Sequence, residues 1–299
     1  MPLRAPRALI PLLAVCGAAA VVGFAGAGAA IEKGGGAPAL DNGVEDPPEP
    51  ATITAMTWDV CGDAAPGCPL GARPGELVRA VEREARGNTV GGRRVKAEAV
   101  LLQRVCSAQV TELKNSAAFK GWAWEFAPDD ERGACANGQG RPGVALGGST
   151  ALGDVRKVRL PAPKGHGRAA VCATSGTWRT RLCSARFSAT AEDPRGEWRR
   201  KQAAELAEAA GPGRVVFGGD LVDQPAARPL DALYRDFAEC DQGPKQRDGG
   251  KTRQNWTGAA VEKTDYLFVN QEAAVSCGVP RTANRSSDHR PMTAVVTFD

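Results

Sequence analysis

The hydrophobic pattern of the chain consists of short β-like runs separated by a few amphipathic segments. Residues 52–60 (TITAMTWDV) are rich in β-branched side chains and predict a strand, and the short apolar run 97–102 predicts a buried one. In residues 74–86 the apolar positions recur at helical spacing behind a proline, so this segment predicts a helix, and residues 110–117 predict another.

The rest of the chain adds more strands than helices. Further strands are predicted at 122–127, 143–146, 155–160, 169–174, 179–187, 215–218, 266–269 and 293–298, and one strongly helical segment spans 194–210 until Gly211 stops it. Most neighbouring strands lack an intervening helix. Much of the sheet is therefore expected to be antiparallel, with the strands packed centrally and the helices outside.

The N-terminus has the layout of a secretory signal peptide. Arg4 and Arg7 precede an uncharged stretch, and small residues before Ile31 offer cleavage sites, so residues 1–30 are predicted to direct export and be removed. The alternative is an uncleaved membrane anchor, because the uncharged stretch is long enough to cross a bilayer. The protein is accordingly expected to be secreted.

Composition divides the remainder into a linker and one domain. Residues 31–51 are rich in Gly, Pro and acidic residues and predict a disordered linker, which leaves 52–299 as one predicted domain without a second linker or a repeat. The formal net charge of +4 permits a polyanionic partner but does not argue for one, and there is no strong nucleic-acid signal.

Eight cysteines follow the export signal, and an even number in that context predicts disulfides. A structural zinc site is the alternative, but the chain has only two histidines and no paired CxxC motif. Cys172 and Cys183 lie on the two arms of a predicted hairpin, almost equally far from its turn, and predict one bridge. Cys61–Cys68 is predicted as a local bridge, and Cys106–Cys135 and Cys240–Cys277 follow by elimination.

Two short motifs carry the clearest chemical signals. In residues 215–221 (VVFGGDL) a buried strand ends in two glycines and then presents Asp220. In residues 286–291 (SSDHRP) Asp288 and His289 stand before the last strand, and an acid beside an imidazole can serve a metal and a substrate oxygen. Each motif alone is also compatible with an ordinary polar turn.

Taken in order with Trp58-Asp59, Gln103 and Thr264-Asp265-Tyr266, these motifs resemble the endonuclease/exonuclease/phosphatase family. The resemblance covers most of residues 52–299. It implies an α/β fold, a four-layer sandwich of two mostly antiparallel β-sheets flanked by helices. It also implies a Mg²⁺-dependent phosphoesterase centre at the mouth of the sandwich.

The resemblance carries over only in part to the residues of the centre. Asp288 and His289 match the family's Ser-Asp-His motif, and Asp220 and Asp265 occupy retained acidic positions, so His289, Asp220 and Asp265 are the retained catalytic candidates. The family's Trp-Asn becomes Trp58-Asp59, which replaces an amide with an acid.

Three positions depart from the family pattern. Arg104 stands where the resemblance places the principal metal ligand, a Glu, Arg186 stands where it places a catalytic His, and Val222 replaces an Asn. Arginine has no acceptor and stays protonated, so it neither ligates a cation nor takes a proton. A slip in the alignment would leave Glu98 or Glu112 as the missing ligand, although neither follows the strand-ending Gln.

Two hypotheses follow. The first is a pseudoenzyme that has lost the metal centre, needs no cofactor, and binds a phosphorylated or other anionic ligand through Arg104 and Arg186. Arg104 is then predicted to contact Asp220 or Asp288 directly and to fill the metal position. The alternative is an active, divergent phosphodiesterase or nuclease in which Asp59, Asp220 and Asp288 hold Mg²⁺ and His289 is the base.

Overall fold

The computed structural model describes residues 49–299, apart from 64–67, 69–72, 131–132, 137 and 244–245. The predicted signal peptide and the predicted linker as far as residue 48 lie outside the described residues. The first strand begins at Ala51, one residue before the predicted start of the domain. Among the described residues, no helix is both long and apolar enough to cross a bilayer.

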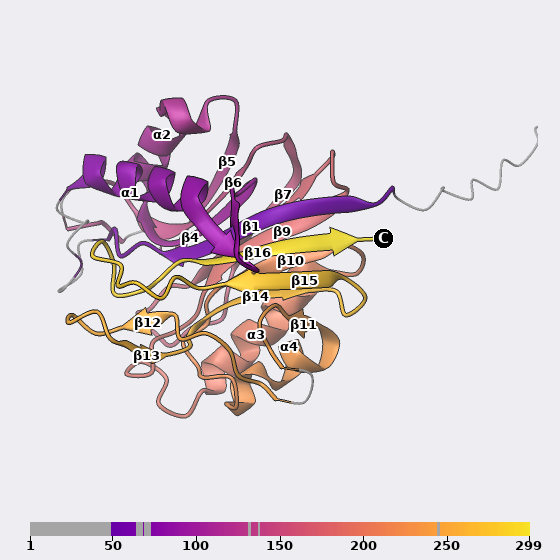
Figure 1. Ribbon diagram of the computed structural model, residues 1–299. Helices are drawn as coiled ribbons and strands as arrows, with labels where there is room; N and C mark the ends of the chain where they lie inside the picture. The colour runs from indigo at the N-terminus through magenta and orange to yellow at the C-terminus, as the bar shows by residue number, and fades with distance from the viewer. Residues whose placement is uncertain (1–48, 64–67, 69–72, 131–132, 137, 244–245) are drawn as a thin grey trace, which may run out of the picture. The chain divides into compact units, whose positions relative to one another are not determined.

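Two six-stranded sheets form the centre of the domain (Figure 1). The first has the order β15 (Ala274–Gly278), β16 (Met292–Phe298), β1 (Ala51–Asp59), β4 (Ala99–Cys106), β6 (Pro142–Gly148) and β5 (Ala123–Pro128). The second has the order β11 (Ala238–Glu239), β14 (Asp265–Val269), β10 (Val215–Asp220), β9 (Thr180–Arg186), β8 (Ala169–Ser175) and β7 (Leu152–Arg159). Within them only β1–β4 and β9–β10 pair in parallel, which confirms the expectation of mostly antiparallel sheets.

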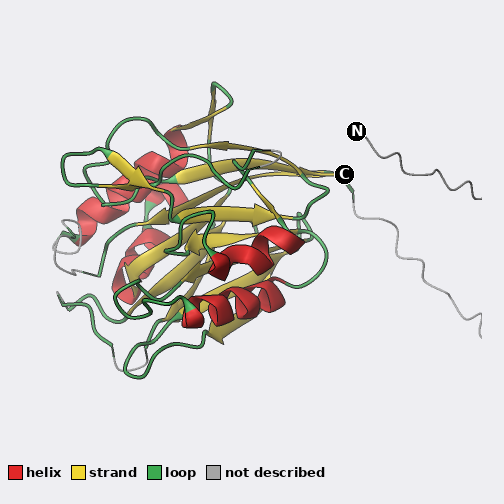
Figure 2. Ribbon diagram, turned by 90° about the horizontal axis from the view of Figure 1, so that it is seen from below, coloured by secondary structure: helices red, strands yellow, loops and turns green. Residues whose placement is uncertain are grey.

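Helices lie on the outer faces of both sheets (Figure 2). They are α1 (Pro74–Gly87), α2 (Ser107–Asn115), α3 (Glu197–Ala210) and α4 (Asp231–Asp236), with 3-10 turns η2 (Ala117–Phe119) and η3 (Arg228–Leu230). One apolar cluster lies between the two sheets, a second lies beneath α1 and α2, and a third lies beneath α3 and α4. This is the predicted four-layer α/β sandwich, because each sheet buries both of its faces.

Several short elements were not predicted. Two small hairpins, β2 (Asn88–Val90) with β3 (Arg93–Val95) and β12 (Arg253–Gln254) with β13 (Ala260–Glu262), flank the main sheets. The edge strand β15 was also missed, since its alternation is interrupted by Ser276, Cys277 and Gly278 and it is only half buried. Short edge elements take their conformation from their neighbours rather than from their own pattern.

All four predicted disulfides are present: Cys61–Cys68, Cys106–Cys135, Cys172–Cys183 and Cys240–Cys277. In the β8–β9 hairpin Cys172 lies directly opposite Cys183, with 4.1 Å between their Cα atoms, so the predicted register is correct. Four bridges in one domain fit an oxidising compartment.

Candidate functional site

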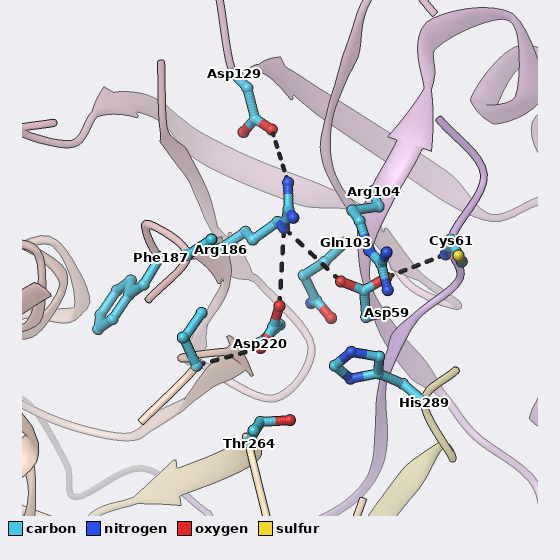
Figure 3. A network of polar contacts seen from close by, with 12 residues as sticks. Asp59, Cys61, Gln103, Arg104, Asp129, Arg186, Phe187, Asp220, Thr264 and His289 are labelled. Carbon is cyan, nitrogen blue, oxygen red and sulfur yellow. Dashed lines mark hydrogen bonds and ion pairs between the residues drawn. The ribbon is translucent and has the colours of Figure 1, made fainter. Parts of the chain in front are cut away.

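The candidate site lies where strands of both sheets end together. Asp59 ends β1 beside Gln103 of the parallel strand β4, and Arg186 ends β9 opposite Asp220 of the parallel strand β10. Asp265 begins the antiparallel strand β14 and pairs with Asp220 in register. Parallel strands place their carboxyl ends at one edge, so residues far apart in the sequence meet there (Figure 3).

A cavity of about 610 Å³ opens on this edge. Its floor includes Arg104, Arg186, Asp220, Asp288 and His289. Asp59 and Asp265 are fully buried behind that floor. The structure therefore brings together the seven residues named from the sequence.

Arg104 reaches this floor because β4 is irregular at its end. The pairing of β4 with β6 shifts between Leu102 and Val105, and Arg104 adopts a left-handed φ of 48°. Its Nε donates to Asp59 Oδ1 at 2.6 Å, and its Nη2 donates to Asp288 Oδ1 at 2.5 Å. The predicted contact with Asp288 is confirmed, and Arg104 bridges two carboxylates.

The contact between Arg104 and Asp59 shifts the pKa values of both groups. Burial alone would lower the pKa of Arg104, but Asp59 and then Asp288 outweigh burial and raise it. Burial would raise the pKa of Asp59, but Arg104, His289 and Arg186 together lower it to about 2. Both groups are therefore charged at neutral pH.

Arg186 has a different environment. Its Nε lies 3.8 Å from Asp59 Oδ2 and 3.7 Å from Asp220 Oδ2, and its Nη1 lies 3.9 Å from Asp129 Oδ2. These distances are ion-pair contacts without hydrogen bonds, and the buried Nε has no hydrogen-bond partner among the described residues. Arg186 is thus attracted to three carboxylates, but none of them accepts a hydrogen bond from its Nε.

Asp129 is a site residue that the sequence reasoning missed. It follows β5 directly, and burial is the main cause that raises its pKa, against the opposing effect of Arg186. The signal was available, because Asp129 comes after a predicted strand in the same way as Asp220 does.

His289 and Asp265 form a buried ion pair. His289 Nδ1 lies 2.8 Å from Asp265 Oδ2. Burial would lower the pKa of His289, but Asp265 and Asp59 raise it to about 9. Burial raises the pKa of Asp220 to about 6 against the opposing charge of His289, with Asp265 and Asp59 adding to the rise. The contact with Asp265 therefore favours the protonated form of the imidazole.

The residues at the floor do not fit a magnesium ion. One possible ligand atom each from Asp59, Asp220 and His289 lies within 4.8 Å of the others, so a cation could be held on spacing alone. However, Arg104 already binds Asp59 and Asp288, and Arg186 Nε faces the second oxygens of Asp59 and Asp220. A divalent ion would have to share these carboxylates with two guanidinium groups, whereas Mg²⁺ demands near-ideal octahedral oxygen ligands.

Neither Glu98 nor Glu112 replaces the missing ligand. Glu98 lies before β4, at the end of that strand remote from Arg104, and its Oε2 accepts the backbone N–H of Thr54 at 3.0 Å. Glu112 is exposed on α2. The interpretation that a register slip hides a true glutamate is therefore wrong.

Val222, the third departure, sits in a strained backbone conformation. Its φ is 68°, in the left-handed region that a β-branched residue rarely adopts. The backbone N–H of Val222 donates to Asp220 Oδ1 at 3.1 Å, and this contact holds the turn. Asparagine tolerates this conformation far better than valine does.

Comparisons with known proteins support the fold. No protein-family model matches the sequence, and no curated protein matches it either. Among solved structures, an endonuclease/exonuclease/phosphatase from Bacteroides vulgatus is similar with a TM-score of 0.64 and 16% identity over 83% of this chain and 100% of that one.

Two further structures are comparable. The human Nocturnin catalytic domain with bound sulfate gives a TM-score of 0.62 at 15% identity, over 83% of this chain and 94% of that one. A mannosyl-6-phosphatase from Bacteroides thetaiotaomicron gives a TM-score of 0.58 at 14% identity, over 82% of this chain and 100% of that one. At these identities the comparisons show a shared fold, and that fold is the endonuclease/exonuclease/phosphatase sandwich.

Proposed function

We propose that this chain is an exported protein that keeps the endonuclease/exonuclease/phosphatase fold without its metal-dependent chemistry, and binds a small anion in the cleft. The observation that carries the proposal is the bridge from Arg104 to Asp59 and Asp288. A fixed guanidinium supplies there the positive charge that a cation would otherwise bring.

The remaining groups of the cleft also lack the required chemistry. A phosphoesterase needs a positioned base, and His289 carries a proton at neutral pH because Asp265 holds it there. General acid–base catalysis by one side chain contributes roughly a hundred- to ten-thousand-fold, and a metal adds several kcal/mol of charge stabilisation. Without both, little of a phosphoesterase rate would remain.

Arg186 is the group proposed to bind the anion. Its Nε has no hydrogen-bond partner among the described residues, and its side chain lines the cavity. The human Nocturnin catalytic domain, whose fold is similar, has a sulfate anion bound. Because Asp59, Asp129 and Asp220 surround Arg186, the affinity is expected to be weak.

The alternative is an active, divergent phosphodiesterase that uses Asp59, Asp220 and Asp288 for Mg²⁺ and His289 as the base. The clustering of Asp59, Asp220 and His289 within 4.8 Å is the observation in its favour. Hydrolysis of bis-p-nitrophenyl phosphate and of DNA, with Mg²⁺ or Mn²⁺ added, separates the two. The pseudoenzyme shows no rate above a denatured control, whereas a chelator-sensitive rate would establish the alternative.

A further inference from the structure

A second group of arginines lies at the opposite end of the strands that build the cleft. Strand β9 runs from Thr180 to Arg186 and β10 runs from Val215 to Asp220, and both reach the cleft at their last residue. At their first residues, with the end of α3 and the β8–β9 turn, they border a cavity of about 270 Å³. Four arginines and one carboxylate line this cavity: Arg156, Arg179, Arg181, Arg214 and Asp154.

Arg181 is held by hydrogen bonds from two of its nitrogens, which leave the third nitrogen without a partner among the described residues. Its Nε donates to the carbonyl of Ala209 at 2.9 Å, and its Nη1 donates to Asp154 Oδ2 at 2.6 Å and to Thr174 Oγ1 at 3.3 Å. Its Nη2 is buried and has no hydrogen-bond partner among the described residues. An unpaired buried donor on a charged group is costly unless a ligand satisfies it.

Arg156 and Arg179 add positive charge that is not balanced locally. Arg179 is exposed and forms no ion pair within the described part of the chain. Arg156 lies 3.6 Å from Asp154, whose carboxylate is already shared with Arg181. Arg214 donates to main-chain oxygens of Glu49 and Asp299 and is not needed for this excess of positive charge. The single side-chain carboxylate of Asp154 therefore lines the cavity together with the three guanidinium groups of Arg156, Arg179 and Arg181.

Backbone strain points to the same place. Among the described residues five non-glycine residues have left-handed φ angles. Cys61, Arg104 and Val222 are at or beside the cleft, and the remaining two, Asp154 (42°) and Arg179 (48°), line this second cavity. Such conformations persist where the surrounding structure enforces them, and they cluster at functional sites.

We infer that this cavity binds a phosphate or sulfate group, at a site separate from the cleft. Guanidinium groups match the geometry of tetrahedral oxyanions through paired hydrogen bonds, which Arg181 Nη2 and Arg179 are free to offer. The cavity is smaller than the roughly 300–1,000 Å³ of sites for drug-sized ligands, so it suits one such group with a small carrier. This inference does not depend on the function proposed for the cleft.

The test is a titration of the isotopically labelled full-length protein at low ionic strength, followed by the backbone amide NMR signals of Gly211 and Gly213, which line the cavity. Sodium sulfate, inorganic phosphate and glycerol phosphate are the probes, and sodium chloride is the blank. Saturable shifts with one of the three probes are expected. Tighter binding of glycerol phosphate would indicate that the natural ligand is a small molecule that carries a phosphate group. Tighter binding of sulfate or phosphate would indicate that the ligand is the inorganic ion itself.

Two exposed arginines supply variants that leave the fold intact. Arg179→Gln is expected to weaken binding about five-fold and the double variant Arg156→Gln/Arg179→Gln about twenty-fold, as charge-assisted contacts are removed. Arg159→Gln is the matched control, because Arg159 is exposed on the same strand as Arg156 but does not line the cavity. The inference is overturned if no probe gives saturable shifts, or if Arg159→Gln weakens binding as much as Arg179→Gln does.

Discussion

The two ends of strands β9 and β10 use arginine in opposite ways. At the cleft end, Arg104 and Arg186 lie among the carboxylates of Asp59, Asp129, Asp220 and Asp288. At the other end, Arg156 and Arg181 share the carboxylate of Asp154, and Arg179 has no ion-pair partner among the described residues. Arg104 therefore acts as an internal counter-ion at the first end, whereas the arginines at the second end are proposed to receive an external anion.

The two ends differ in their local balance of charge. Arg104 satisfies two acids that would repel each other without it, so its main contribution is to the stability of the cleft. At the other end the excess is positive, so a ligand from outside is needed to balance it. Experiments that remove or reverse single charges should separate these roles.

The largest expected effect is the restoration of activity. The triple variant Arg104→Glu, Arg186→His and Val222→Asn supplies the groups that the family resemblance places there. With Mg²⁺ it should hydrolyse bis-p-nitrophenyl phosphate at least about a hundred-fold faster than the wild type, the lower bound for one general acid–base group. Each single variant should stay inactive, because either a guanidinium remains on the carboxylates or the base is missing. A wild type as active as the triple variant would rule out the pseudoenzyme.

Removal of Arg104 should have the largest effect on stability. Arg104→Ala leaves Asp59 and Asp288 without their counter-ion, and breaking a buried pair in this way costs about 3–5 kcal/mol. Arg179→Ala at the other end should change the free energy of unfolding by less than about 0.5 kcal/mol. Urea unfolding measures both.

Magnesium sharpens the same comparison. In Arg104→Ala the carboxylates of Asp59 and Asp288 lose their guanidinium partner, so added Mg²⁺ should recover part of the lost stability, while Arg179→Ala should not respond. If Arg104→Ala unfolds like the wild type and ignores Mg²⁺, then Arg104 is not a substitute for a cation.

Asp220 should make the cleft less stable as the pH rises. Its folded pKa of about 6 lies above the value of 3.8 for an unperturbed group, so its contribution is fully favourable below pH 3.8 and is lost as the pH rises through 6. Asp220→Asn removes that loss and should stabilise the protein at pH 7.5 by up to roughly 2–3 kcal/mol, with little gain at pH 4. Asp231→Asn, at an exposed acid, is the control and should show no such trend. Equal gains at both pH values would argue against a buried charge at Asp220.

Relief of backbone strain should have the smallest effect. Val222→Asn keeps a side chain at a left-handed position but is better tolerated there, and should stabilise by about 1 kcal/mol. Val222→Ala is the comparison, since alanine also disfavours this conformation. If thermal unfolding shows Val222→Ala to be more stable than Val222→Asn, then side-chain packing, and not the φ angle, determines the stability at this position.

Most helices and strands were predictable because their signals are local, whereas the four-layer arrangement was expected from the family resemblance. The helix at Pro74–Gly87, the hairpin around Gly176 and the disulfide Cys172–Cys183 follow from periodicity and spacing. The seven residues named as candidates from the sequence lie together in the structure, and each stands at or near one end of a predicted strand. Asp129 and the arginine cavity were not found, because their members come from separate elements and meet only when the sheets pack.

Binding of a divalent cation to the wild-type protein tests the central claim most directly. Isothermal titration with Mn²⁺ should give no saturable heat for the wild type up to millimolar concentrations, because Arg104 occupies the carboxylates of Asp59 and Asp288. The triple variant should bind one ion under the same conditions. One Mn²⁺ bound by the wild type, and lost in Asp220→Asn, would contradict the account and establish a working metal centre.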